Sequence, residues 1–151
     1  MKPEDFAGRL RALVAQESIR SCAAESDFLA TEERLGIVVP ADIRTFYRQI
    51  GGSDEATPLE NGWVTFWPLD RWESTQEFGR RLALIADHGT ESWWYAIPAD
   101  AEIAAPIFIV DRIREPRRIA GSFGDFAEAV MRDDSSIYAQ PLPKGGAARR
   151  R

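Results

Sequence analysis

The chain has one histidine and one cysteine, so chemistry that needs an imidazole or a thiol has a single candidate position for each. Asp87 and His88 have the residue types of a general base and the carboxylate that orients it. The same pair continues into Gly89 and Thr90, and this tetrapeptide is also typical of a hairpin turn. Cys22 is expected in the core or at its boundary, and alone it supports neither an intrachain disulfide nor a cysteine-based zinc site.

Carboxylates are the other reactive groups, and the 24 acidic residues leave a glycosidase-type pair open on sequence alone. The sequence has no glycine-rich phosphate loop, no HExxH zinc motif, no nucleophile elbow and no cluster of metal ligands. We therefore expect a protein without catalytic residues, cofactor or metal. A hydrolase that depends on carboxylates or on His88 remains as an alternative.

The acids concentrate in segments that carry turn signals, and such segments can meet at one end of a sheet. There they would form a negative patch complementary to a basic protein, which mainly speeds encounter and sets specificity. Adjacent tryptophans in a strand point to opposite faces, so one of the two at positions 93 and 94 is expected to be an exposed interface anchor. The expected partner-binding residues are Asp54, Glu55, Glu60, Asp70, Glu73, Asp87, Glu91, Trp93 and Trp94. The alternative is a solvated acidic surface with tryptophans that pack in the core.

Charge is distributed unevenly along the chain. The net charge is −5, but the last eleven residues hold four cations and no acid, so residues 1–140 have 15 basic and 24 acidic residues. A body with a charge of −9 repels nucleic acid and attracts a basic partner. No apolar run approaches the ~20 residues of a membrane span, and the N-terminus becomes acidic where a signal peptide would be apolar. We expect a cytoplasmic protein that contacts neither membrane nor nucleic acid.

Hydrophobic periodicity indicates which elements position these residues. Helices are predicted over residues 3–14, 25–35, 40–50 and 122–133, and strands over 63–67, 82–86, 92–97, 106–111 and 118–120. Residues 74–81 are expected to be a short helix or a loop, and Ile137 and Tyr138 are expected to fold back onto the core. The resulting class is α+β, with N-terminal helices and a C-terminal helix packed around a mostly antiparallel sheet of four to six strands. Residues 1–140 form one domain, and 141–151 a disordered basic tail.

One stretch has unusually clear helix signals. Its pattern is Glu32-x-x-Leu35-Gly36-x-x-Val39-Pro40-x-x-Ile43-x-x-Phe46-Tyr47-x-x-Ile50-Gly51-Gly52. This pattern resembles the signature of the SUKH superfamily, the Smi/Knr-type domain. The aromatic strand that leads into Trp67, the hairpin around residues 87–95 and the closing helix are similar as well, so the resemblance covers about residues 3–138. Ile50 departs from it, since many members carry an asparagine that helps to close the turn.

The resemblance implies binding rather than catalysis. Bacterial SUKH proteins are mostly thought to be immunity proteins that bind and neutralise the toxin domain of a polymorphic toxin, often a nuclease. This implies a cognate toxin, of basic charge, as the partner. Eukaryotic relatives resemble regulatory scaffolds, so an adaptor that binds a cellular protein is the alternative. The signature itself is expected to be structural, with Glu32 in a capping or pairing role.

Overall fold

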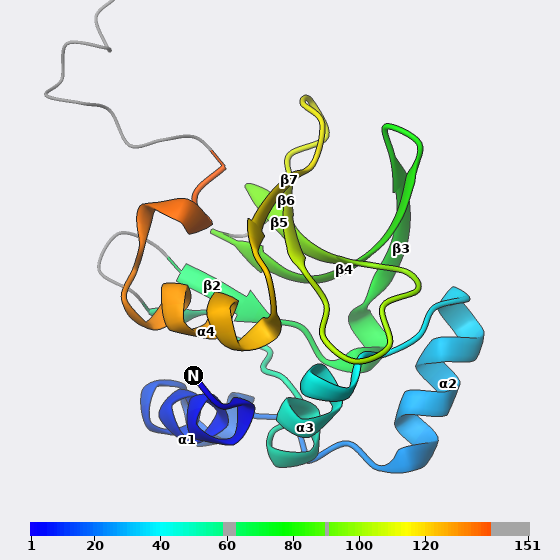
Figure 1. Cartoon of the computed structure of the whole chain (residues 1–151). Coiled ribbons are helices and arrows are strands. Elements are labelled where there is room, and N and C mark those ends of the chain that lie inside the picture. Colours follow the sequence, from blue (N-terminus) through cyan, green and yellow to red (C-terminus); the bar gives the residue numbers. More distant parts are fainter. Residues whose placement is uncertain (59–62, 90, 140–151) are drawn as a thin grey trace, which may run out of the picture.

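The computed structural model describes residues 1–58, 63–89 and 91–139 (Figure 1). The predicted tail at 141–151 lies outside them. The helices are α1 (Pro3–Leu13), α2 (Glu25–Leu35), α3 (Ala41–Gln49) and α4 (Phe123–Met131), with short 3₁₀ turns η1 (Gln16–Ser18), η2 (Leu69–Arg71) and η3 (Ser135–Ile137). The four predicted helices are therefore present, with ends shifted by one or two residues. None of the described helices has the length and apolar content needed to cross a membrane.

The sheet is antiparallel throughout. Its strands are β1 (Thr57–Pro58), β2 (Trp63–Phe66), β3 (Glu73–Glu77), β4 (Arg80–His88), β5 (Trp93–Pro98), β6 (Ile107–Val110) and β7 (Arg117–Ala120). The spatial order is β1-β2-β4-β5-β6-β7, and β3 also pairs with β4. The α+β class and the arrangement of helices around the sheet are confirmed, although the described sheet has seven strands rather than four to six.

Two local predictions are wrong. The segment predicted as helix or loop at 74–81 forms β3 and the start of β4. Its residues are polar on both faces, so no periodicity marked it, and only pairing with β4 makes it a strand. The predicted turn at 87–90 begins too early, because Asp87 and His88 still pair with Thr65 and Val64 of β2.

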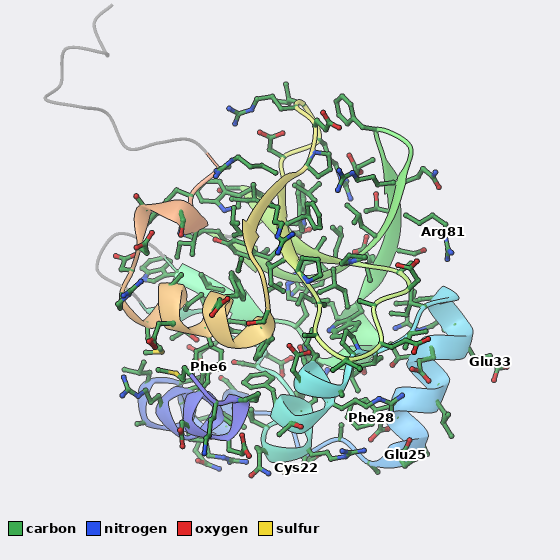
Figure 2. All side chains as sticks on the ribbon, viewed as in Figure 1. Phe6, Cys22, Glu25, Phe28, Glu33 and Arg81 are labelled. Carbon is green, nitrogen blue, oxygen red and sulfur yellow. The ribbon has the colours of Figure 1, made fainter. Side chains whose placement is uncertain are left out.

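The core lies between one face of the sheet and the helices. The Phe6 ring of α1 lies 5.4 Å from the Phe46 ring of α3 and 5.1 Å from the Phe66 ring of β2. Phe123 and Phe126 of α4 also contact Phe66. All five side chains are fully buried or nearly so, and large aromatic side chains in such contact dominate core energetics. Figure 2 shows Phe6 between α1 and α4.

The end of the described chain folds back onto the sheet, as predicted. Ile137 and Tyr138 are buried, and the Ile137 carbonyl accepts a 2.6 Å hydrogen bond from the Tyr95 hydroxyl. The Trp93 indole donates to the same carbonyl at 3.2 Å. This segment thereby packs against Trp93 and Tyr95 of β5 and His88 of β4.

Glu32 fixes the corner between α2 and α3. Its carboxylate accepts hydrogen bonds from the Val39 backbone N–H at 2.9 Å and from the Arg44 guanidinium at 2.8 Å. Arg44 also donates to the Val39 carbonyl and lies over the Phe28 ring, with its carbon 5.0 Å from the centroid. One carboxylate thus sets the path of the link from Gly36 to Pro40. The structural role expected for Glu32 is confirmed.

Replacement of Glu32 tests this corner. Glu32→Ala leaves the Val39 N–H and one side of Arg44 without their acceptor, so we expect the free energy of unfolding to fall by about 2 kcal/mol. Glu32→Gln keeps an acceptor for Val39 and should lose less. The measurement is equilibrium urea unfolding.

Glu33→Ala is the matched control, because Glu33 is the exposed neighbour that points away from the domain (Figure 2). It should change stability by less than about 0.5 kcal/mol. Equal losses at positions 32 and 33 would contradict the role given to Glu32.

Candidate functional site

The candidate site is built on the link between β2 and β3. Both strands pair with the same edge of β4, β2 through Phe66 opposite Ala86 and β3 through Glu73 opposite Leu84. The chain between them must therefore turn along that edge, and it does so through Trp67 and the 3₁₀ turn η2. The Trp67 N–H donates to the Ile85 carbonyl at 3.0 Å, opposite the bulge in the β4–β5 pairing.

Buried hydrogen bonds hold this link against α3. The Tyr47 hydroxyl donates to the Trp67 carbonyl at 2.5 Å, and the Trp72 indole N–H lies 3.3 Å from both oxygens. All three side chains are fully buried. A buried carbonyl without a donor costs free energy, so these bonds fix where η2 emerges at the surface.

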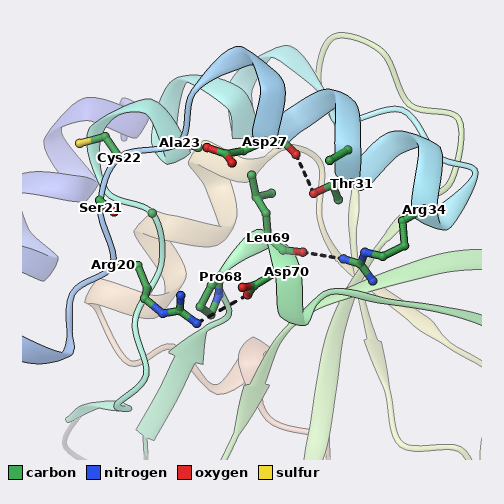
Figure 3. A pocket seen from close by; sticks show the side chains of 12 residues that line it. Arg20, Ser21, Cys22, Ala23, Asp27, Thr31, Arg34, Pro68, Leu69 and Asp70 are labelled. Atoms are coloured by element: carbon green, nitrogen blue, oxygen red, sulfur yellow. Dashed lines mark hydrogen bonds and ion pairs between the residues drawn. The ribbon is translucent and has the colours of Figure 1, made fainter.

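A pocket of about 280 Å³ lies between η2, α2 and residues 20–23 (Figure 3). Arg34 of α2 bridges one side by donating to the carbonyls of Leu69 and Trp72 at 2.9 and 3.1 Å. Apolar groups of Ala23, Pro68 and Leu69 share the lining with charged side chains of Arg20, Asp27, Arg34 and Asp70. This mixture suits one side chain of a protein partner better than a small apolar ligand.

Gly51 of the signature lines this pocket, and close contacts require both residues of the pair to be glycine. A Cβ at Gly51 would lie 2.0 Å from the Ser21 carbonyl oxygen, and one at Gly52 2.7 Å from the Pro68 nitrogen. Gly52 also has a φ of +93°, which side chains rarely adopt. The pair therefore lets residues 20–21 and 67–68 lie close to the chain just after α3 ends. Ile50 lies at the position where the signature often has an asparagine. Its side chain is buried in the core, and the chain turns here without that asparagine.

Two arginines tie the expected acids together on this surface. Arg20 pairs with Asp54 at 3.1 Å and with Asp70 at 3.6 Å. Arg71, the next residue after Asp70, lies 3.6 Å from Asp87 and 3.9 Å from Glu91. The four carboxylates come from three separate parts of the chain, since Asp87 and Glu91 belong to the same β4–β5 hairpin. We call Asp54, Asp70, Asp87, Glu91 and their two arginines the η2 band.

Asp87 is the buried member of the η2 band. Its side chain is 3 % exposed, and burial raises the pKa of this carboxyl while the charge of Arg71 opposes the rise. Arg71 in turn stacks on Trp67, with its guanidinium carbon 4.3 Å from the ring centroid. A buried ionisable group whose pKa is raised in this way is a candidate for a functional role.

The remaining acids have different surroundings. Glu55 is exposed beside the η2 band, and its carboxylate accepts a hydrogen bond from the Ser18 hydroxyl. Glu73 is exposed on β3 rather than in a loop. Glu60 lies outside the described residues. Nothing in the sequence pattern pointed to Arg20, Arg34 or Arg71, because their positions relative to the acids depend on the tertiary fold.

Trp93 and Trp94 point to opposite faces, as expected for neighbours in a strand. Trp93 stacks on His88 at 4.3 Å and 12° beneath the returning C-terminal segment. Trp94 donates to Glu91 at 3.4 Å and carries the Arg112 guanidinium at 4.4 Å over its ring. Both are half-buried, so the exposed anchor expected in this pair is not found.

The structure separates Asp87 from His88. Asp87 faces Arg71, whereas His88 lies on the other face of β4 between Trp93 and Tyr138, where burial lowers its pKa. The pair therefore does not have the geometry of a base and its orienter. Cys22 is exposed and lines the pocket, so the position expected for it in the core or at its boundary is wrong. Within the described ranges, no group of three or more His, Cys, Asp or Glu side chains is placed to hold a metal.

Comparison with known proteins gives one match. No curated protein and no solved structure matches the chain significantly. The model of the SMI1 / KNR4 family (SUKH-1) matches residues 22–129, which include the glycine pair, η2 and every strand. Because the match covers more than half of the chain, this protein belongs to the SMI1 / KNR4 family (SUKH-1).

Proposed function

We propose that this protein is a non-catalytic immunity protein, which binds and neutralises the toxin domain of a cognate polymorphic toxin in the bacterial cytoplasm. Family membership supports a role of this kind. The observation that carries the proposal is the η2 band, in which two guanidiniums hold four carboxylates from three parts of the chain.

The η2 band keeps a net negative charge. Four carboxylates against two guanidiniums leave two charges uncompensated, and the exposed Glu55 beside them adds a third. A negative surface of this kind attracts a basic partner such as a nuclease cleft and steers its approach. The arginines hold the carboxylates in place before binding, which lowers the ordering cost of association.

The pocket beside the η2 band offers a place for an anchor. It shares Arg20 and Asp70 with the band and has an apolar floor at Pro68 and Leu69. An interface commonly gains most of its affinity from one or two side chains inserted into such pockets, with charged groups around them. We infer that a side chain of the toxin enters here.

The decisive experiment uses the gene next to this one. Its C-terminal domain is expressed with and without this protein, and cell survival and complex formation are measured. Protection together with a purified complex supports the immunity function. A complex without protection, or a neighbouring gene without a toxin-like domain, would favour a regulatory adaptor instead.

Charge reversal tests the η2 band as the toxin-binding surface. Asp54→Lys with Asp70→Lys turns the surroundings of Arg20 positive, so the association rate constant for a basic toxin should fall about tenfold at low salt. Stopped-flow measurements over a range of salt concentrations give the rate. The difference from wild type should shrink as salt rises.

Glu33→Lys with Glu102→Lys is the control, because both acids are exposed outside the band and the change in net charge is the same. This control should associate at nearly the wild-type rate. Equal association rate constants for both double variants would show that the η2 band is not the surface that attracts the toxin, even if the protein still protects the cell.

Asp87→Asn tests the free-energy cost of burying the charged Asp87 carboxylate. Because the pKa of Asp87 in the folded protein is above its unfolded value, the stability contributed by its protonated form is present below the unfolded pKa. That contribution is lost as pH rises through the folded pKa. The free energy of unfolding of wild type, relative to Asp87→Asn, should therefore decrease between pH 4 and pH 7, as measured by urea unfolding. A constant difference across this range would show that Asp87 is not strained by burial.

A further inference from the structure

The two hairpins β3–β4 and β6–β7 carry a second surface with the opposite charge. Figure 1 shows both hairpins extending upward, away from α1 and α3. Their tips are linked by an ion pair between Arg112 and Glu77 at 3.7 Å. The tips also present two large apolar side chains, Phe78 at 58 % and Ile113 at 83 % exposure.

The tips have strained backbone. Phe78 has a φ of +52° and Arg112 a φ of +66°, which residues other than glycine rarely adopt. Each such residue costs of order 1–2 kcal/mol, and strain of this kind is concentrated at binding sites. Phe78 and Gly79, with φ values of +52° and +81°, form the two-residue turn between Glu77 and Arg80, and the Phe78 ring is mostly exposed.

Between the hairpins, two arginines stack on aromatic rings of one sheet face. Trp94 pairs with Val110 and Ala96 with Phe108, so Trp94 and Phe108 share a face. This face is opposite to the one on which Tyr95 contacts Phe126 of α4. The Arg112 guanidinium carbon lies 4.4 Å from the Trp94 ring centroid, and that of Arg80 lies 4.9 Å from the Phe108 centroid.

Stacking leaves the in-plane N–H groups of a guanidinium free to donate to a carboxylate. Arg80 forms no ion pair within the described part of the chain, and the single pair of Arg112 is long. Among the described residues, Arg81, Arg117 and Arg118 likewise form no ion pair. Residues 73–81 and 107–120, which include the tips of both hairpins, hold six arginines and four acids, so this part of the sheet has a net charge of +2 on a body with a net charge of −9.

A pocket of about 400 Å³ adjoins Arg80. Its floor includes Leu82, Pro98 and Phe108, and its rim includes Arg80, Arg81 and the acid Asp100. An apolar floor beneath a free guanidinium fits a segment that has an apolar side chain next to a carboxylate. The basic residues 141–151 have no acid and are excluded by charge as its occupant.

We propose that this surface binds an acidic segment of a partner protein, with Arg80 and Arg112 pairing with its carboxylates and Phe78 and Ile113 flanking it. The inference does not depend on the η2 band or on the immunity function, because it uses a different and oppositely charged surface. The negative body of the domain disfavours nucleic acid as the ligand.

The test uses the full chain and a short fluorescent peptide of alternating glutamate and leucine, followed by anisotropy. The same peptide with glutamine in place of glutamate is the uncharged control. The acidic peptide should bind, and Arg80→Glu or Arg112→Glu should each weaken it about tenfold, the effect of losing one charge-assisted hydrogen-bonded pair. Circular dichroism monitors folding of the variants. If Arg80→Glu does not fold, Arg80→Gln takes its place.

Arg9→Glu is the matched control, since Arg9 is exposed on α1 and the charge change is the same. It should bind the acidic peptide within about twofold of wild type. No binding by wild type, equal binding of the glutamine peptide, or equal weakening by Arg9→Glu would overturn the proposal. So would tighter binding of a single-stranded DNA oligonucleotide of the same charge, or a dimer in sedimentation analysis that Arg80→Glu abolishes.

Discussion

The hydrogen bond from the Tyr47 hydroxyl to the Trp67 carbonyl joins α3 to the link between β2 and β3, on which the candidate site is built. Trp67 must leave the sheet where β2 ends, because β3 takes over the same edge of β4. Its carbonyl is then buried without a strand partner, and Tyr47 together with Trp72 supplies the donors. The position of η2 therefore depends on where α3 places one hydroxyl group.

The position of α3 depends in turn on Glu32. Because this carboxylate holds both the Val39 N–H and Arg44, it fixes the direction in which α3 leaves the corner with α2. The glycine pair that follows α3 then lets residues 20–21 and Pro68 lie against the chain at the end of the helix. The signature stretch is thus more than a mark of the fold, since it also forms part of the pocket beside the η2 band.

Charge is arranged so that the two proposed surfaces differ in sign. Around η2, arginines hold a larger number of carboxylates, whereas between the hairpins aromatic rings hold arginines that lack acidic partners. The surfaces approach each other at Trp94, whose indole donates to Glu91 of the η2 band while its ring supports Arg112. A protein with both surfaces has the means to distinguish a basic partner from an acidic one.

The sequence by itself determined the helices, most of the strands, the α+β class and the family, because helix ends and hydrophobic periodicity are local properties. It did not reveal β3, whose polar residues form a strand only because the edge of β4 is free to pair. It placed acids such as Asp54 and Asp70 in separate loops, but not Arg20 between them. Only the tertiary structure decided that Asp87 and His88 lie on opposite faces, because pairing with β2 extends β4 through both residues. It also decided that Arg20 and Arg71 pair with the acids, since these ion pairs join residues from different parts of the chain.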